Sequence, residues 1–280
     1  MRNKKISHMI RYGIVYLVVI LGAITFLIPL AWMFLTSLKI PAQIYVYPPE
    51  WIPNPVKWEN YLQMLTFFPF FRYLLNTLYI TSLNVIGVLV SCSLVAYGIT
   101  HIRWPGRNII FILVISVLII PYVVTLIPLY LMYHRLGWVG SYKPLWVASF
   151  FGVWAFHTFL LRQFFLAIPM ELSDAAKIDG CSEFRIYWNI VLPLSRPALF
   201  AVALFEFLWT WNDFLMPLVY LTNQKMYTLS LGLAFFQGTH DTAVNLLMGA
   251  SSLVTIPVLI LFFFTQRSFI EGITLTGLKG

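Results

Sequence analysis

Charged residues are scarce in this 280-residue sequence, at 10% of the chain against about 25% in soluble domains. Hydrophobic residues make up 60%, and the mean hydropathy is +0.82. So little polar surface cannot solvate a globule of this size. The composition excludes a soluble enzyme, a secreted disulfide scaffold and a disordered tail, and it indicates an integral membrane protein.

Cysteine is equally rare, with Cys92 and Cys181 as the two examples. Cys92 falls inside an apolar run and Cys181 in a polar loop, so the two thiols are expected at different depths and no disulfide is expected between them. Neither has a His neighbour in the sequence that would make it a nucleophile. We interpret both as packing residues.

Catalytic and nucleotide-binding motifs are lacking. Gly272 and Gly277 have the glycine spacing of a P-loop, but Leu278 and Lys279 follow where the Lys-Ser/Thr pair would be needed. No HExxH, GxSxG or Cys/His cluster occurs either. We therefore expect a chain that is not an enzyme and that binds no cofactor or metal of its own.

Long apolar runs are what the sequence has in abundance. A helix needs about 20 such residues to cross a bilayer, whereas barrel strands would show short alternating segments. The runs predict an all-α integral membrane protein in which residues 1–280 form a single transmembrane domain. Its six spans are expected at about 12–35, 73–100, 108–133, 144–166, 197–221 and 242–266. The first run exceeds the roughly 7–15 residues of a signal-peptide core, so we interpret it as a retained helix.

The distribution of Lys and Arg predicts the orientation of these spans. If the N-terminus is inside, the inner segments carry twelve of the 18 basic residues: Arg2, Lys4, Lys5, Arg11, Arg103, Arg107, Arg162, Lys177, Arg185, Arg196, Arg267 and Lys279. Both termini are thus expected in the cytoplasm of a multi-pass protein of the inner or cytoplasmic membrane. This topology also explains the net charge of +8 without nucleic-acid binding.

The inner loop 167–196 predicts two short helices joined by a turn. Pro169 suits the first turn of a helix because its missing N–H costs nothing there. Glu171 and Asp174 place negative charge near the positive end of the helix dipole. Gly180 suits the left-handed residue that ends such a helix.

The second helix of this loop is expected to begin at Ser182, whose hydroxyl can cap it. Phe184, Trp188 and Val191 have the spacing of one helical face. Pro193 is expected to end the helix.

Ala175 and Ala176 give the first helix a face of small side chains. A helix of this kind, flanked by charge, can fit a groove on another protein. It can equally rest on lipid headgroups as an amphipathic surface helix, and the residue pattern alone leaves both interpretations open.

A family resemblance decides between them. Asp174-Ala-Ala-x-x-Asp179-Gly180, followed by Leu192-Pro193, resembles the EAA loop of binding-protein-dependent ABC importer permeases. Further segments are similar to the carbohydrate branch of that family and in particular to its MalG-like subunits: Tyr73–Leu78, Pro128–Tyr130, Phe159–Phe165, Leu192–Ala198, Trp211–Phe214 and Gly272–Gly280. The resemblance runs from about Tyr12 to Gly280. Asp174 departs from the usual Glu, which keeps the charge on a shorter side chain.

The resemblance implies a type I ABC importer permease fold with a cytoplasmic helix-turn-helix coupling loop. That loop would dock on a separate cytoplasmic ATPase dimer, which would bind ATP and magnesium, through Glu171, Asp174, Ala175, Ala176, Asp179, Gly180, Leu192 and Pro193. A second, MalF-like permease subunit would complete the translocation pathway. The segment 222–246 corresponds to an outer loop that engages an extracytoplasmic substrate-binding protein, with Gln237, Gly238, Thr239, His240 and Asp241 as candidate contacts.

Glu206 and Asp213 are the acids inside a predicted span. Burying a charge there is costly, so such residues usually face a cavity or a partner. Seven residues apart, they are expected on one face of a continuous helix. Together with Asn212 they are candidates for the translocation path, the alternative being a hydrogen-bonded acid that holds the helices together. His157 is interpreted as a packing residue.

The function expected from the sequence is that of a permease subunit that carries a sugar or oligosaccharide in an ATP-driven importer. A glycerol-phosphate importer is the first alternative, because such permeases look similar. A secondary transporter that uses Glu206 and Asp213 as coupling acids is a weaker alternative, since no internal repeat is detectable.

Overall fold

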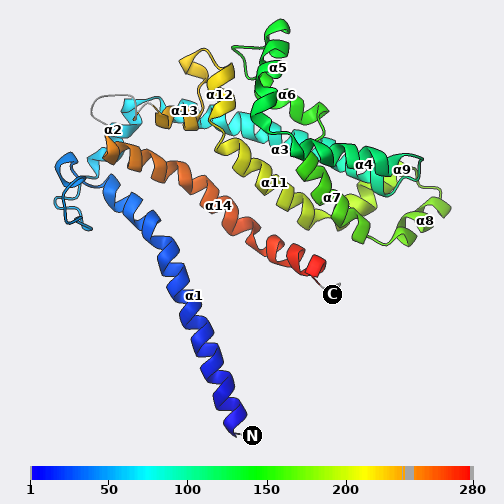
Figure 1. Cartoon of the computed structure of the whole chain (residues 1–280), viewed down its shortest axis with the longest axis horizontal. Helices are drawn as coiled ribbons and strands as arrows, with labels where there is room; N and C mark the ends of the chain where they lie inside the picture. Colours follow the sequence, from blue (N-terminus) through cyan, green and yellow to red (C-terminus); the bar gives the residue numbers. More distant parts are fainter. Residues whose placement is uncertain (1, 235, 237–242, 278–280) are drawn as a thin grey trace. The chain divides into compact units, whose positions relative to one another are not determined.

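The computed structural model describes residues 2–234, 236 and 243–277, and the side chains of residues 11–234, 236 and 243–266. Within these residues the chain is helical and contains no strand, as expected for an all-α membrane protein (Figure 1). It divides into two compact units. One contains the residues up to Pro69 together with Leu233–Ile256, and the other contains Phe70–Gly232 together with the residues from Pro257 onward.

Four helical segments are long and apolar enough to cross a membrane without a sharp bend: Arg11–Ser37, Phe70–Thr100, Lys143–Ala167 and Val244–Gln266. They correspond to the first, second, fourth and sixth predicted spans. Two further candidates consist of bent helix pairs, which gives four to six spans by length and composition. The predicted architecture of a multi-pass helical membrane protein is therefore confirmed.

The third predicted span, expected as one helix over 108–133, is broken in the middle. Helix α4 (Arg107–Ser116) continues into the 3₁₀ turn η2 (Val117–Ile119), and helix α5 (Tyr122–Arg135) leaves at an angle of 100°. Pro121 is the physical reason, since its ring pushes the preceding residue out of the helical region. Ile120 accordingly has extended backbone angles of φ −81° and ψ 117°.

The fifth predicted span, expected over 197–221, is also interrupted. Helix α11 (Arg196–Trp211) ends and helix α12 (Leu215–Tyr220) begins after three further residues. Pro217 cannot donate to the carbonyl of Asp213 and would clash with it in a continuous helix. The Asp213 carbonyl accepts the Ser230 hydroxyl at 2.6 Å instead.

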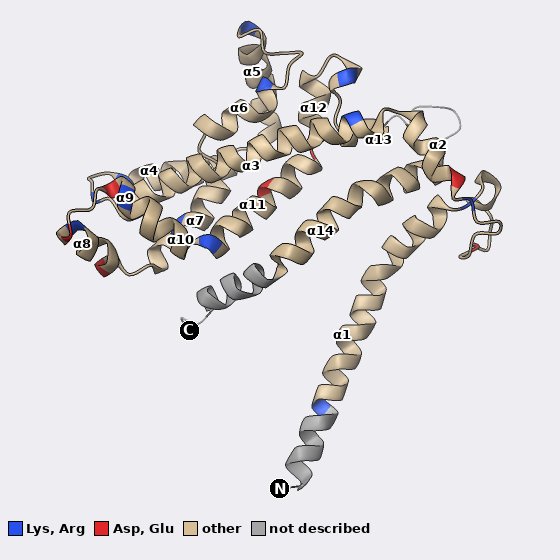
Figure 2. Cartoon of the chain, turned by 180° about the vertical axis from the view of Figure 1, so that it is seen from behind, with Lys and Arg blue, Asp and Glu red and all other residues tan. Residues whose placement is uncertain are grey.

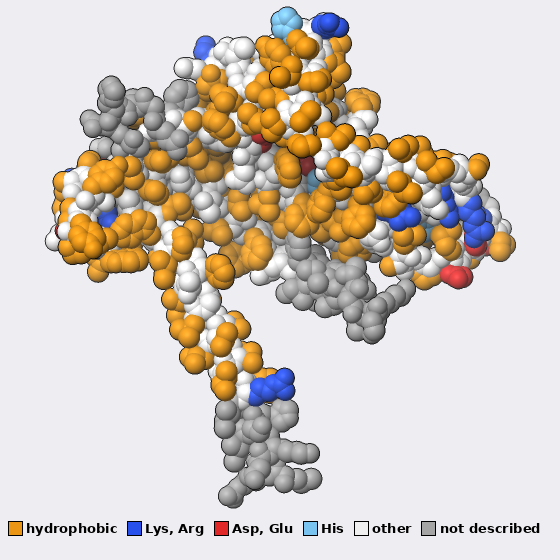
Figure 3. Space-filling view, viewed as in Figure 1, with side chains coloured by type: hydrophobic (Ala, Val, Ile, Leu, Met, Phe, Trp, Pro, Cys, Tyr) orange, Lys and Arg blue, Asp and Glu red, His pale blue; other side chains and the backbone are white. Residues whose placement is uncertain are grey.

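The first unit contains helix α1 (Arg2–Ser37), the short turn η1 (Pro41–Gln43) and helix α2 (Glu59–Phe67). The Asn60 side chain fixes the end of α1, because its amide donates to the carbonyls of Ser37 and Lys39 at 2.8 and 2.9 Å. Apolar side chains cover most of the exposed surface of α1 over its described side chains, residues 11–37, as expected of a helix that faces lipid (Figure 3). Helix α14 (Val244–Gly277) has residues in both units.

The second unit is built around helix α3 (Phe70–Thr100), which packs against α6 (Lys143–Phe151), α7 (Ala155–Ala167) and α11 (Figure 1). Two polar residues of α3 bind the backbone of α6: Asn84 donates to the Leu145 carbonyl and Ser91 to the Ser149 carbonyl, both at 2.8 Å. Gly87 lies between them, where the two helices approach most closely. Helix α3 therefore has contacts along most of its length.

Candidate functional site

The first helix of the predicted docking loop is α8 (Met170–Ile178), which begins directly after Pro169. Glu171 lies in its first turn, where a negative charge stabilises the helix end. Gly180 follows the helix with φ +79°, so the prediction of a left-handed residue at this position is confirmed. A chain reversal of this kind is open to glycine and strained for most other residues.

Helix α8 has one buried side and one exposed side. Ser173 and Ala176 are buried, whereas Glu171, Asp174 and Ala175 are exposed. The expected alanine face is therefore wrong in detail, because neighbouring residues of a helix point about 100° apart and only Ala175 faces outward. Asp179 and Gly180 are exposed as well, and Ile178 is 87% exposed. The exposed residues of α8 thus combine acidic side chains with two large apolar ones, Leu172 and Ile178.

The second helix of the loop begins as expected. Ser182 precedes α9 (Glu183–Ile186) and its hydroxyl accepts the Arg185 N–H at 3.4 Å. The chain then continues through the π-helical turn η3 (Tyr187–Val191) into α10 (Leu192–Leu194).

The π turn changes which side chains pack inward. Phe184 and Trp188 stack on each other and are 66% and 60% exposed, whereas Val191 is fully buried with Tyr187. The expected face of Phe184, Trp188 and Val191 is therefore wrong, because i→i+5 bonding widens the turn and moves Val191 to the other side. The wider turn was not visible in the α-helical spacing.

Pro193 was expected to end this helix, and that prediction is wrong. It lies near the start of α10, where a missing N–H is tolerated, and the helix runs on to Leu194. The chain bends by 79° between this segment and α11, at Ser195. Leu192 is half-buried and Pro193 is exposed.

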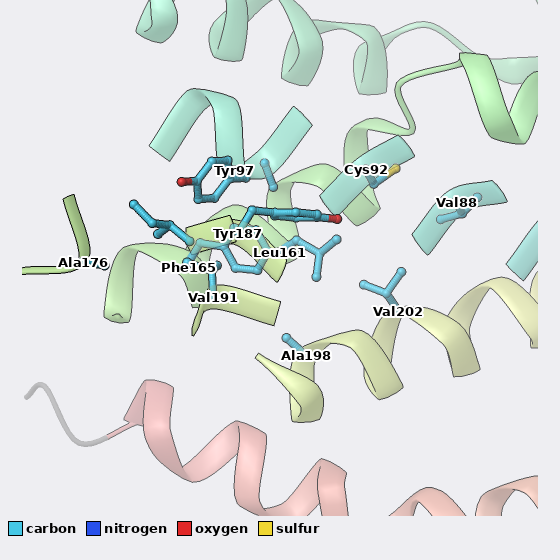
Figure 4. Close-up of a cluster of buried hydrophobic side chains, with 12 residues drawn as sticks. Val88, Cys92, Tyr97, Leu161, Phe165, Ala176, Tyr187, Val191, Ala198 and Val202 are labelled. Atoms are coloured by element: carbon cyan, nitrogen blue, oxygen red, sulfur yellow. The ribbon is translucent and has the colours of Figure 1, made fainter. Parts of the chain in front are cut away.

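An apolar core joins the loop to the rest of the second unit (Figure 4). Tyr97 of α3, Leu161 and Phe165 of α7, and Tyr187 and Val191 of η3 point toward one another. Ala176 of α8 and Ile186 of α9 belong to the same cluster, as do Val88, Cys92, Ala96, Ala198 and Val202. The loop is thus a packed part of this unit, and Cys92 is one of its buried packing residues. Cys181 is half-buried and packs against the same core.

Charged side chains gather where α8 and α9 lie, while the helices beside them carry few (Figures 2 and 3). Lys177 of α8 and Glu183 of α9 form an ion pair at 2.7 Å. Arg103 and Asp174 are 4.0 Å apart and mostly exposed, a geometry that contributes little to stability. The loop therefore presents its charge at one end of the second unit.

The intramembrane acid Glu206 is buried against α7. Its carboxylate lies 3.8 Å from His157 Nε2 and accepts the Thr210 hydroxyl at 2.9 Å. The hydrogen bond to Thr210 stays within α11, and the 3.8 Å approach to His157 is the contact that reaches α7. His157 is buried too, so sequence reasoning missed its role as the partner of Glu206.

Asn212 and Asp213 do not share a helical face with Glu206, because α11 ends at Trp211. Asp213 instead accepts the Met216 N–H at 3.2 Å and starts α12. Asn212 is exposed and donates to the Leu208 carbonyl at 2.8 Å. Both residues lie in the break between two helices, where backbone and side-chain polar groups are available.

The predicted binding-protein contacts Gln237, Gly238, Thr239, His240 and Asp241 lie outside the described residues. The described part of their segment contains η4 (Gln224–Met226) and α13 (Leu229–Ala234). Across the described side chains, no group of three or more His, Cys, Asp or Glu residues could hold a metal ion.

Residues 83–269 match the family described as "Binding-protein-dependent transport system inner membrane component". The chain is 38% identical over 205 residues to the arabinooligosaccharides transport permease AraQ of Halalkalibacterium halodurans, with 73% of each chain covered. It is 32% identical to the trehalose/maltose transport permease MalG of Thermococcus litoralis, with 93% of this chain and 94% of the relative covered. The sn-glycerol-3-phosphate transport permease UgpE of Yersinia pestis is 31% identical, with 92% and 94% covered.

The fold has a counterpart among solved structures. A chain of a bacterial ABC transporter involved in the import of alginate superposes with a TM-score of 0.79 at 22% identity, covering 91% of this chain and 95% of the other. The structural likeness shows the fold alone. The family model matches residues 83–269, which are about two thirds of the chain. The chain belongs to the family of binding-protein-dependent transport system inner membrane components.

Proposed function

We propose that this chain is the permease subunit of an ATP-driven importer and that its substrate is a sugar or oligosaccharide. Membership of the binding-protein-dependent family supports the importer, and the names of AraQ and MalG support the substrate class. The observation that carries the proposal is the α8–α9 loop, a packed helix-turn-helix with an exposed acidic side. Both chain ends and this loop would lie in the cytoplasm.

The loop would dock on a dimer of ATP-binding subunits. Its docking surface would comprise Glu171, Asp174, Ala175, Ala176, Asp179, Gly180, Leu192 and Pro193, of which Ala176 acts from the buried side by allowing α8 to pack closely. The acidic outward side, with the exposed apolar side chains of Leu172 and Ile178, suits a groove that is apolar inside and basic at its rim. ATP and magnesium would be bound and used by the partner, and this chain would contribute no catalytic group.

The translocation path would be formed with a MalF-like second permease subunit. On this chain we propose that Glu206, Asn212 and Asp213 border it, since the break after α11 places polar groups within an otherwise apolar region. In a background lacking Cys92 and Cys181, Glu206→Cys should react with a small water-soluble thiol reagent in at least one nucleotide state. If the cysteine does not react in any nucleotide state while transport stays normal, Glu206 has the packing role that its contact with His157 supports.

An extracytoplasmic substrate-binding protein would complete the system, with residues 237–241 as its contact on this chain. The direct test is to co-express the chain with its neighbouring permease, ATPase and binding-protein genes and to purify the assembly. Reconstituted in liposomes, the assembly should take up sugar with ATP hydrolysis, and this chain alone should not. Robust ATP-dependent uptake by the isolated chain would contradict the proposal.

Glycerol phosphate remains a second candidate substrate because UgpE is as similar to this chain as MalG is. The binding protein of the system distinguishes the two, because a ligand screen on it should select either a neutral saccharide or a phosphate ester. A secondary transporter using Glu206 and Asp213 would instead show uptake driven by an ion gradient without ATPase subunits.

A further inference from the structure

Three polar residues follow one another at a spacing of four, two in the last turns of α3 and one directly after it, and each binds the helix-turn-helix loop or its entry. The Ser93 hydroxyl is 2.7 Å from the Tyr187 hydroxyl, and the Tyr97 hydroxyl donates to a Glu183 carboxylate oxygen at 2.6 Å. His101 Nδ1 is 3.1 Å from the Ser173 hydroxyl. A spacing of four places these side chains on one face of the helix, and this face is directed at the loop.

Glu183 lies at the centre of this network. One carboxylate oxygen accepts Tyr97 of α3, and the other accepts Lys177 of α8 at 2.7 Å. A single side chain therefore joins both loop helices to α3. Partial burial acts to raise the pKa of Glu183, but the hydrogen bonds from Lys177 and Tyr97 outweigh it and hold the pKa below its usual value, so the group is ionised when it makes these bonds.

His101 completes the anchorage in its neutral form. Burial lowers its pKa, although the Phe165 carbonyl acts in the opposite direction. Its Nε2 lies 3.3 Å from that carbonyl, which can only accept, so Nε2 carries the proton and Nδ1 accepts the Ser173 hydroxyl. Both ring nitrogens are thus used, one toward α7 and one toward α8.

The backbone leaves the loop at two bends, one toward α7 and one toward α11. It joins α7 through Ile168 and Pro169, which have extended backbone angles, and it joins α11 across the 79° bend at Ser195. The side chains on both sides of these junctions pack in the shared core, since Leu161 and Phe165 of α7 and Ala198 and Val202 of α11 belong to it. The attachment to α3 adds directed side-chain hydrogen bonds to this core.

The opposite end of α3 holds the segment that leads toward the predicted binding-protein contact. The Asn76 amide donates to the carbonyls of Lys225 and Tyr227 at 3.0 and 2.9 Å, and the Leu229 N–H donates to the Thr77 hydroxyl at 2.9 Å. Asn76 and Tyr97 are separated by about 32 Å at 1.5 Å per helical residue, roughly the thickness of the hydrocarbon core. No proline interrupts α3 between them.

We propose that α3 acts as a rigid lever between the two sides of the membrane, with Glu183 and Asn76 as the positioning residues at its ends. The inference rests on the proposed docking of the loop on an ATPase. Movement of the docked loop is passed to α3 through Tyr97 and Glu183, and from α3 to residues 225–229 through Asn76.

The test uses the full assembly in lipid nanodiscs and measures ATP hydrolysis with and without its binding protein. Glu183→Gln keeps the shape but loses the charge, and Asn76→Ala loses both backbone contacts. Each should leave assembly and basal hydrolysis close to wild type and reduce the stimulation by the binding protein by about five- to tenfold. Glu59→Gln and Asn108→Ala, at exposed positions outside the network, serve as matched controls and should change nothing.

The double variant separates a lever from two local defects. If Glu183 and Asn76 act on one lever, Glu183→Gln with Asn76→Ala should be no worse than the more damaging single change. The lever proposal would be contradicted if the losses of stimulation in the two single variants multiplied in the double variant. Normal stimulation in either single variant would also contradict it. Failure of the wild-type assembly to form or to respond to its binding protein would instead overturn the proposed function.

A covalent rescue covers the case in which a variant destabilises the loop. Tyr97→Cys with Glu183→Cys, in a background lacking Cys92 and Cys181, should lose stimulation when reduced. Cross-linking with a short bifunctional methanethiosulfonate should restore it, because the reagent replaces the broken connection. Inactivation by the cross-link, or no rescue despite complete reaction, would show that the loop must move relative to α3 and would contradict the proposal.

Discussion

Helices α3 and α11 are both apolar by composition, but one is continuous and the other is interrupted at both ends. Helix α3 runs for 31 residues without a proline and carries its polar side chains where it contacts α6 and the loop. Helix α11 has 16 residues, begins after a 79° bend and ends where Asn212 and Asp213 leave the helix. Helices of similar hydropathy can thus differ in continuity, one running unbroken and the other bounded by a bend and a break.

The largest effect is expected where α3 is packed most tightly. A Cβ at Gly87 would lie 2.8 Å from Phe150 Cδ2 and 2.9 Å from the backbone of Ser149. Overpacking of this kind costs about 1–3 kcal/mol, more than the few tenths gained by replacing a helical glycine. Gly87→Val should therefore lower the thermal unfolding midpoint of the purified assembly by several degrees. Gly98→Val, on the same helix with nothing within 4 Å, is the control and should leave the midpoint nearly unchanged.

The next effect concerns the turn between the two helices of the docking loop. Gly180 has φ +79°, which costs a β-branched residue about 1–2 kcal/mol. Gly180→Val should leave membrane insertion near normal, because each span closes its own hydrogen bonds, while substrate no longer stimulates hydrolysis by the assembly. Gly180→Asn should retain most of the stimulation, since Asn tolerates the left-handed region. Tight assembly and full transport in Gly180→Val would show that coupling does not need this turn.

A smaller effect is expected at the break after α11. Asp213 accepts the Met216 N–H at 3.2 Å and so caps the first turn of α12. Removing such a cap costs about 0.5–2 kcal/mol, whereas Asn can replace Asp in this role. Asp213→Ala should lower the unfolding midpoint modestly and Asp213→Asn should restore it. Equal losses in both variants would point to the charge of Asp213 rather than to its capping bond.

The smallest effect is a pH dependence of the loop anchorage. The pKa values of His101 and Glu183 are both lowered, so the folded anchorage binds fewer protons than the unfolded chain and is favoured as pH rises. Its stability should be complete above about pH 6.5, should decrease below that value as His101 becomes charged, and should decrease again below about pH 4.5 through Glu183. Hydrogen exchange of residues 170–186 at pH 7.5 and pH 5.5 measures this, and His101→Gln should flatten the difference. Faster exchange at the higher pH would contradict the sign, once the intrinsic rates are corrected.

The rough positions of four spans could be predicted from the sequence because hydropathy and length report directly on bilayer thickness. The breaks could not, since the runs containing Pro121 and Asn212 stay apolar on either side of the bend. Pro121 was a visible signal, but a proline within a span can also kink a helix without ending it. Hydropathy records which residues avoid water and says little about where a helix changes direction.

The loop was predicted well where local chemistry determines it and poorly where packing does. Pro169, Gly180 and Ser182 act on their own backbone, so their positions followed from residue type. The π turn places Val191 inward together with Tyr187, whose hydroxyl bonds Ser93 of α3 about 90 residues away in sequence, and local spacing does not reveal so distant a contact. The spacing of Ser93, Tyr97 and His101 was the sign of that contact available in the sequence. It showed a polar helix face but did not show which residues that face would contact.

The most direct test of the lever is a pair of distances measured by pulsed electron paramagnetic resonance in the assembled transporter. Spin labels at Leu75→Cys and Asn189→Cys measure the distance from the outer end of α3 to the loop. Labels at Leu218→Cys and Asn189→Cys measure the distance from α12 to the same loop position. All three sites are exposed, and Cys92 and Cys181 are replaced beforehand. The account predicts that the first distance stays constant between the nucleotide-free and ATP-bound states while the second one changes. A change in the first distance as large as in the second would contradict the claim that α3 and the loop move together.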